Sequence, residues 1–221
     1  GEITGSIDES ARHAITKLAH YHFPSTQKSA NNIIRMGEDK NNVFMFGCPS
    51  ADVVNQIPNK IDTKSLDIGV GPILDFKKDY IVVLFHPVTT EYQSSETQMI
   101  EVLEALKKIN KQVLLIWPNI DAGSDGVSQA IRRFREFNSK LKLHAYKNFE
   151  PDIFISLLKN ACLAIGNSSS FIRDASFIAT PIILVGSRQD GRERAESVIR
   201  VEPNRNEIFN AALTHEKHKP Y

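Results

Sequence analysis

Residues 162–191 restrict the possible folds of this chain more than any other stretch. Two short apolar runs, Cys162–Ile165 and Ile182–Val185, have the composition of buried strands. Between them lie the polar loop Gly166–Ser170 and the segment Phe171–Ile178, whose apolar residues have helical spacing. A strand, a loop, a helix and a second strand in this order are typical of a parallel sheet.

The same alternation of strands and helices runs through the rest of the chain. We expect further strands at Tyr21–Pro24, Val43–Gly47, Tyr80–Phe85, Val113–Trp117 and Lys142–Tyr146, and helices at Ile7–Tyr21, Ser25–Met36, Ser50–Ile57, Glu96–Ile109, Ser128–Phe137, Pro151–Ala161 and Asn206–Leu213. The predicted fold class is therefore α/β, with a Rossmann-like parallel sheet flanked by helices. Residues 48–78 are polar and rich in glycine and proline, and they mark a candidate domain boundary.

Composition excludes several classes of protein. A formal net charge of +1 over 221 residues gives no argument for a nucleic-acid or membrane partner. Cys48 and Cys162 lie far apart, so the sequence predicts neither a disulfide framework nor a metal site, and a cytoplasmic location is expected. No apolar run approaches the roughly 20 residues that a membrane span needs.

Four polar residues each lie just past the carboxyl end of a predicted strand: His86, Asn119, Ser168 and Arg188. Because the carboxyl ends of parallel strands meet at one edge of a sheet, we expect these side chains to lie close together and to bind a ligand there. Taken singly, each has an ordinary alternative role: a structural histidine, a turn asparagine, a helix cap and a solvated arginine.

The loop Ser168–Ser170 indicates that the ligand is anionic. Small hydroxyl residues at the start of a helix leave backbone N–H groups available, and a phosphate fits such a place. Asp174 lies one turn into the predicted helix and could accept hydrogen bonds from ligand hydroxyls, while Arg188 could add a guanidinium from the next strand end.

Five segments, in collinear order, resemble the hydrolysing UDP-N-acetylglucosamine 2-epimerases of sialic acid biosynthesis. They read GEITGSIDESARHAITK, HPVTT, PNIDAGS, GNSSSFIRD and GSRQDGRERAESV. The resemblance implies a two-domain GT-B fold and an enzyme that converts UDP-N-acetylglucosamine and water to N-acetylmannosamine and UDP. In that reaction UDP is eliminated to give a glycal, which is then hydrated, and neither a metal nor a nicotinamide is needed.

The resemblance also implies roles for individual residues. Asp8 matches an active-site carboxylate, Arg12 would orient it, and His86 matches a histidine that meets the diphosphate near the sugar. Asp8 and Arg12 could instead stabilise their own helix through its dipole and an ion pair. The UDP-binding residues implied are His86, Asn119, Phe149, Ser168, Ser169, Asp174 and Arg188.

This chain departs from the family pattern in three ways. The glycine-rich loop and the other active-site residues of the family's amino-terminal domain are missing, so we expect a chain with little activity by itself. Asp174 stands where the family usually has glutamate, and Asp125 stands where animal enzymes have a lysine for feedback inhibition. The implied parts are the remainder of an amino-terminal domain (1–60), a UDP-binding domain (61–205) and a terminal helix and tail (206–221). We expect a homo-oligomer, either a dimer or a tetramer.

Three alternative functions stay open. The substrate of a hydrolysing enzyme could be a UDP-diacetamido-trideoxyhexose. A non-hydrolysing 2-epimerase is less well matched, because that class usually has PEExNR where this chain has IDESAR. The chain could also be a UDP-sugar-binding half-domain with no reaction of its own, and fold analogy alone does not separate these functions.

Overall fold

The computed structural model describes residues 7–61, 66, 69–119 and 122–217. The chain divides into two compact units. The first comprises Gly1–Gln56 with Gln189–Glu193, and the second comprises Ile57–Arg188 with Arg194–Tyr221.

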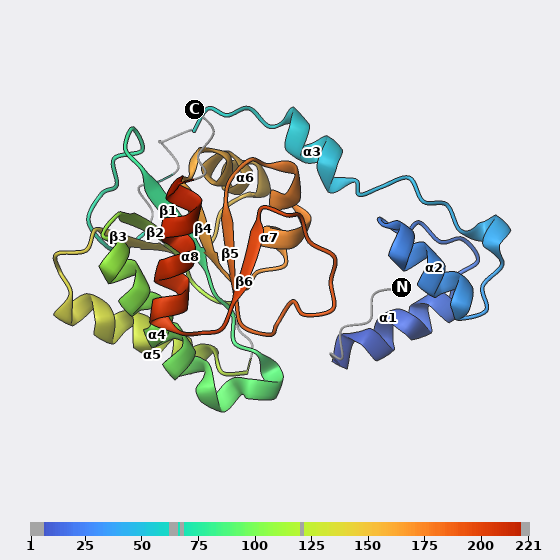
Figure 1. The fold of residues 1–221 in the computed structure, drawn as a ribbon, viewed down its shortest axis with the longest axis horizontal. Helices are drawn as coiled ribbons and strands as arrows, with labels where there is room; N and C mark the ends of the chain where they lie inside the picture. The colour runs from blue at the N-terminus through green and yellow to red at the C-terminus, as the bar shows by residue number, and fades with distance from the viewer. Residues whose placement is uncertain (1–6, 62–65, 67–68, 120–121, 218–221) are drawn as a thin grey trace. The chain divides into compact units, whose positions relative to one another are not determined.

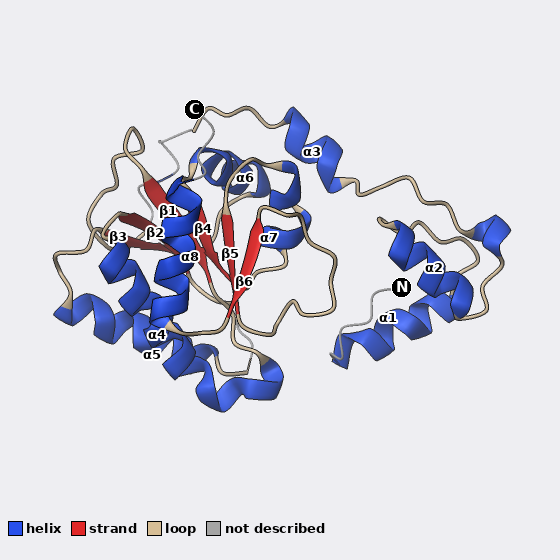
Figure 2. Cartoon of the chain, in the orientation of Figure 1, coloured by secondary structure: helices blue, strands red, loops and turns tan. Residues whose placement is uncertain are grey.

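The second unit is built on one parallel sheet with the strand order β3-β2-β1-β4-β5-β6 (Figure 2). The strands are β1 (Tyr80–Leu84), β2 (Gln112–Ile116), β3 (Leu143–Tyr146), β4 (Leu163–Gly166), β5 (Ile182–Val185) and β6 (Val198–Val201). Nearly every residue of the five strands β1 to β5 is buried, because both faces of the sheet are covered. This explains why these strands read as continuous apolar runs in the sequence.

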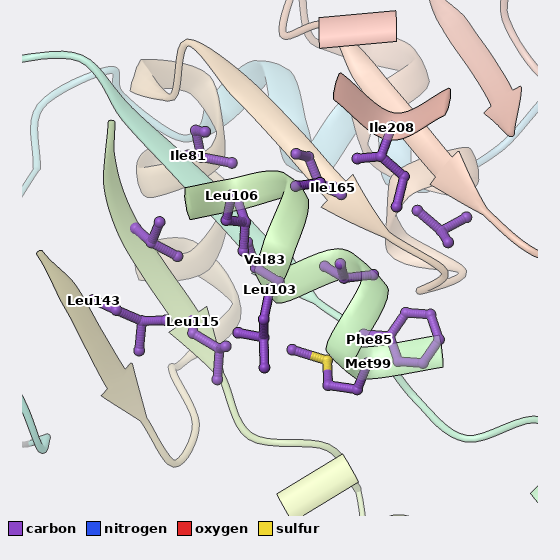
Figure 3. Packing of buried hydrophobic residues seen from close by; sticks show 14 of the residues in the cluster. Ile81, Val83, Phe85, Met99, Leu103, Leu106, Leu115, Leu143, Ile165 and Ile208 are labelled. Carbon is purple, nitrogen blue, oxygen red and sulfur yellow. The ribbon is translucent and has the colours of Figure 1, made fainter. Parts of the chain in front are cut away.

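Alternate residues of each strand enter two separate cores. Ile81 and Val83 of β1 pack in one core, whereas Tyr80 and Val82 pack in the other. This division follows from the period of two in a strand, where successive side chains point to opposite faces. Figure 3 shows the first core, in which Ile81 and Val83 lie with residues of other strands and with Met99, Leu103 and Ile208 from helices.

Helices supply the outer layer on both faces (Figure 1). Core contacts place α4 (Ser95–Ile109), α5 (Ser124–Phe137) and α8 (Arg205–Lys217) on one face of the sheet, and α6 (Pro151–Asn160) and α7 (Ser170–Arg173) on the other. The short 3₁₀ helices η3 (Thr89–Ser94) and η4 (Ala175–Phe177) precede α4 and follow α7. None of the helices in the described ranges is long and apolar enough to cross a membrane.

One expectation about this unit was wrong, and one strand was missed. The helix expected over Phe171–Ile178 is a single α-helical turn, α7, followed by η4. Strand β6 was not expected at all. It is an edge strand of four residues with a half-buried middle, so its sequence lacks the long apolar run of a central strand.

The first unit consists of helices and loops. Its elements are α1 (Ile7–Leu18), α2 (Gln27–Arg35), η1 (Lys40–Asn42) and α3 (Ser50–Gln56). The strands expected at Tyr21–Pro24 and Val43–Gly47 are reduced to one parallel bridge, between His22 and Val43. The apolar composition of both segments favours strands, and they do lie side by side. A strand also needs a paired neighbour along its whole length, and two short segments form only a marginal pair.

The carboxylate of Glu101 joins α4 to α8 in the second unit, and its contribution to stability depends on pH. Glu101 accepts hydrogen bonds from the backbone N–H and the guanidinium of Arg205, at 2.8 and 2.9 Å on one carboxylate oxygen. The side-chain hydrogen bond from Arg205 is the main reason why the pKa of Glu101 lies below its ordinary value. A carboxylate with a lowered pKa in the folded state stabilises the protein above its unfolded pKa, and this stabilisation is lost as the pH falls through the folded value.

We therefore expect Glu101→Gln to lower the melting temperature at pH 7. The difference from the wild type should shrink as the pH falls below about 4, the ordinary pKa of a glutamate. Thermal melts at a series of pH values would measure this. Glu96→Gln is the control, because Glu96 pairs with Arg133 at the surface, where an ion pair contributes little. An equal effect of both changes at every pH would contradict the prediction.

Candidate functional site

The candidate site lies at the carboxyl edge of the sheet, where the chain reverses the direction in which it adds strands. From β1 the chain adds β2 and β3 on one side, and it then crosses to add β4, β5 and β6 on the other. The carboxyl ends of β1 and β4 therefore flank a topological switch point, with Leu84 opposite Gly166 in the register. Open α/β sheets bind ligands outside the carboxyl ends of the strands at such a point.

Asn167 joins the two loops that leave the sheet at the switch point. Its side-chain Oδ1 accepts a hydrogen bond from the backbone N–H of His86 at 2.7 Å, and its Nδ2 donates to the backbone oxygen of His86 at 2.8 Å. Asn167 is only 1% exposed. Asn167 was not among the predicted site residues, although it lies inside the GNSSS loop, because an asparagine after a strand is usually a turn residue.

The imidazole of His86 is buried and has a defined tautomer. The backbone N–H of Asn119 donates to its Nδ1 at 3.3 Å, so the neutral ring carries its proton on Nε2. The loops after β1 and β2 thus meet as expected from the sequence. The contact uses the backbone of Asn119, whose side chain is exposed.

Ser168 and Ser169 begin the turn into α7. Ser168 is buried, and its Oγ accepts from the backbone N–H of Ser170 at 3.3 Å. Ser169 is the N-cap residue but makes no side-chain cap hydrogen bond. Since α7 is a single turn, its dipole is weaker than the longer predicted helix would provide, and local N–H and hydroxyl groups have to supply most of any attraction for an anion.

Arg188 follows β5 and reaches back to the loop after β4. Its Nη1 donates to the backbone oxygen of Asn167 at 3.1 Å. The structure therefore brings His86, Ser168 and Arg188 to one edge through contacts with the Asn167 loop. Asp174 lies at the end of α7, where its carboxylate accepts from Arg173 at 3.1 Å.

Phe149 lies after β3 in an aromatic stack. Its ring is tilted against Tyr146 at 4.8 Å between centroids, and Tyr146 is stacked on His144 at 4.3 Å. Phe149 is partly buried against the core on the α6 and α7 face. Its predicted place near a uracil stays a prediction.

The two remaining predicted residues belong to the first unit. Arg12 lies on α1, where its backbone oxygen accepts a hydrogen bond from Thr16 at 3.0 Å. The side chain of Asp8 lies outside the described residues. The roles assigned to both residues stay predictions.

Within the part of the chain that the structure describes, no group of three or more histidine, cysteine, aspartate or glutamate side chains could hold a metal ion. The donors gathered at the edge of the sheet are hydroxyl, amide, imidazole and guanidinium groups. Such groups suit an oxyanion better than a hard cation, which prefers carboxylate and carbonyl oxygens.

The strand order and the polar groups at the switch point define a Rossmann-like α/β protein, and the fold class expected from the sequence is confirmed. The family model described as UDP-N-acetylglucosamine 2-epimerase matches residues 1–220, so the chain belongs to this family. The resemblance carried by the five motifs is thereby confirmed at the level of the family.

Individual relatives are similar over nearly the whole chain. The chain is 34% identical over 215 residues to UDP-N,N'-diacetylbacillosamine 2-epimerase (hydrolyzing) of Legionella pneumophila, covering 97% of this chain and 54% of that protein. It is 30% identical over 213 residues to UDP-N-acetylglucosamine 2-epimerase of Neisseria meningitidis, covering 96% and 54%. The chain thus spans about half the length of the curated relatives it matches.

A solved structure gives the same fold. The crystal structure of UDP-GlcNAc 2-epimerase from Neisseria meningitidis bound to UDP-GlcNAc superposes with a TM-score of 0.72 at 16% identity. The match covers 96% of this chain and 57% of that chain. At this identity the likeness concerns the fold alone.

Proposed function

We propose that the carboxyl edge of the sheet binds the UDP group of a UDP-sugar. The observation that carries this proposal is the convergence of His86, Ser168 and Arg188 on the buried Asn167 loop at the switch point. These groups are hydrogen-bond donors of the kind that recognise phosphate oxygens, and they lie where α/β sheets bind nucleotides.

Each residue has a chemical task in this proposal. Ser168 and Ser169 offer hydroxyl and backbone N–H groups to the diphosphate, and the Nε2–H of His86 donates to a phosphate oxygen near the sugar. Arg188 lines the uridine pocket with Phe149 and Asn119. Asp174 accepts hydrogen bonds from ribose hydroxyls, with a side chain one methylene shorter than the usual glutamate.

In the whole protein we propose the hydrolysing reaction. The C2 proton of UDP-N-acetylglucosamine is removed as the bond from C1 to the UDP oxygen breaks, which yields a glycal and UDP. Water then adds across the double bond with the configuration at C2 inverted, and N-acetylmannosamine is released. Asp8, oriented by Arg12, would serve proton transfer, and no metal or redox cofactor takes part in these steps.

A second substrate is favoured by one specific observation. The Legionella relative, at 34% identity, is named for UDP-N,N'-diacetylbacillosamine, a sugar of the diacetamido-trideoxyhexose class. Either sugar carries the same UDP group, so the proposed edge site serves both. Turnover by the complete protein, with each UDP-sugar in turn and release of free sugar as the signal, separates the two substrates and also distinguishes hydrolysis from simple epimerisation.

The UDP site is tested by calorimetric titration of this chain. We expect UDP to bind and ADP not to bind, and we expect Arg188→Ala to weaken UDP binding at least tenfold, since a hydrogen bond to a charged group contributes about 1.5–3 kcal/mol. Arg133→Ala is the matched control, because Arg133 is a surface arginine paired with Glu96. Failure of the folded chain to bind UDP, or equal affinity for ADP, would refute the proposed site.

A further inference from the structure

A hydrogen bond between two loops of the second unit involves none of the residues assigned to the UDP site. The hydroxyl of Ser187 donates to Oε1 of Glu91 at 2.7 Å, across 96 residues of sequence. Glu91 lies in η3, in the loop after β1, and Ser187 lies in the loop after β5. The two residues form the Glu91–Ser187 clasp.

The clasp closes a circuit of contacts around the switch point. In the sheet, β4 lies between β1 and β5, so the strands that carry these two loops are not neighbours. His86 is joined to Asn167, and the backbone oxygen of Asn167 accepts from Arg188. Arg188 follows Ser187 directly, and the clasp leads back to the loop that holds His86. The Asn167 loop is thus held on one side by His86 and on the other by Arg188.

The carboxylate of Glu91 is held in place from its own side of the clasp. Its second oxygen accepts from the side-chain amide of Gln98 at 2.9 Å. Its backbone is fixed as well, because its N–H donates to Val88 at 2.8 Å and its carbonyl oxygen accepts from Ser94 at 2.8 Å. Glu91 has non-helical dihedral angles inside η3, with φ −128° and ψ 25°. The carboxylate that accepts from Ser187 is therefore also held by contacts with residues of its own segment.

We propose that Glu91 and Ser187 are positioning residues that hold Arg188 in its binding position for UDP; this inference rests on the proposed UDP site. Arginine has a long side chain on a loop, and ordering that loop at the moment of binding would reduce affinity. The clasp orders the residue next to Arg188 in advance. Glu91 and Ser187 act through Arg188 and need no contact with UDP themselves.

The experiment is a double-mutant cycle read by UDP affinity. We expect Glu91→Ala and Ser187→Ala each to weaken UDP binding about fivefold, the ratio that corresponds to about 1 kcal/mol for one net hydrogen bond. The double variant should bind like either single variant, because both changes remove the same contact. Ser187→Thr keeps the hydroxyl and should restore most of the affinity.

Two controls separate positioning from other effects. Glu96→Ala also removes one carboxylate from the region where α4 begins, but its partner is Arg133, so UDP affinity should not fall. Melting temperatures should stay close to the wild type, because the clasp lies at the surface. A structural role would instead lower the melting temperature in the Glu91→Ala and Ser187→Ala variants.

Several outcomes would overturn the inference. Additive losses in the double variant would mean that Glu91 and Ser187 act independently, for example if Ser187 itself touched the ligand. If both single variants bind UDP with unchanged affinity while Arg188→Ala binds it more weakly, Glu91 and Ser187 do not position Arg188. The proposed UDP site would be unaffected by that result. A folded wild type that does not bind UDP would refute both the proposed UDP site and the positioning role of the clasp.

Discussion

Replacing Gly166 with alanine is expected to destabilise the second unit more than any other single change predicted for it. A Cβ at this position would lie 2.0 Å from the backbone oxygen of Leu84 and 2.6 Å from its carbonyl carbon. Leu84 is the register partner of Gly166 on β1, so the obstacle is the backbone of a central strand that cannot move aside. Gly166 also has a φ of 149°, which L-residues rarely adopt.

The expected cost is more than about 3 kcal/mol, because the clash adds overpacking to backbone strain. A domain is usually stable by only about 5–15 kcal/mol, so much of the margin would be lost. Urea denaturation followed by circular dichroism measures the change. Gly186→Ala is the control: Gly186 also has a positive φ, of 78°, but a Cβ there meets nothing within 4 Å.

The comparison of Gly166 with Gly186 separates the cost of the steric clash from the cost of the positive φ angle, which both glycines have. We expect Gly186→Ala to cost about 1 kcal/mol, from backbone conformation alone. Equal losses at both positions would mean that the approach of β4 to β1 is not what requires a glycine at position 166.

Replacing Asn167 with alanine is expected to have the second largest effect. The change removes both buried hydrogen bonds between the Asn167 side chain and the backbone of His86. Removing one partner of a buried hydrogen bond costs about 1–3 kcal/mol, so the free energy of unfolding should fall by about 2–6 kcal/mol. The affinity for UDP should fall as well, since the loop that carries His86 is no longer tied to the loop that carries Ser168.

Urea denaturation and UDP titration of the same variant measure the two effects. For the stability measurement, Asn119→Ala is the matched control at the same edge of the sheet. The contact from Asn119 to His86 comes from its backbone N–H, which alanine keeps, so stability should stay within about 0.5 kcal/mol of the wild type. A stable Asn167→Ala variant with normal UDP affinity would show that the paired hydrogen bonds do not organise the site.

Much of the sheet could be predicted from local sequence. Strands β1 to β5 are buried on both faces, so each reads as an apolar run, and the runs alternate with helical patterns. The exceptions have a common cause. Strand β6 is a short edge strand, and the segments around His22 and Val43 form only one bridge, so in both places pairing depends on neighbours rather than on local composition.

The helix after the GNSSS loop shows a similar limit. The apolar spacing over Phe171–Ile178 is real, and Phe171 and Ala175 are fully buried. The α-helix nevertheless ends after one turn and continues as η4. The spacing of apolar residues identifies the face that packs against the core. It does not decide where an α-helix ends and a 3₁₀ turn begins.

The α/β class, the family and the residues that follow the strands at the candidate site could all be read from local patterns, because strand burial and the ends of parallel strands leave such patterns. The strand order, and with it which strand ends are neighbours, became known only from the folded chain. The folded chain also revealed Asn167 as the residue between His86 and Arg188, and the Glu91–Ser187 clasp. These contacts join residues 81, 21 and 96 positions apart, and such separations leave no periodic signal in a single sequence.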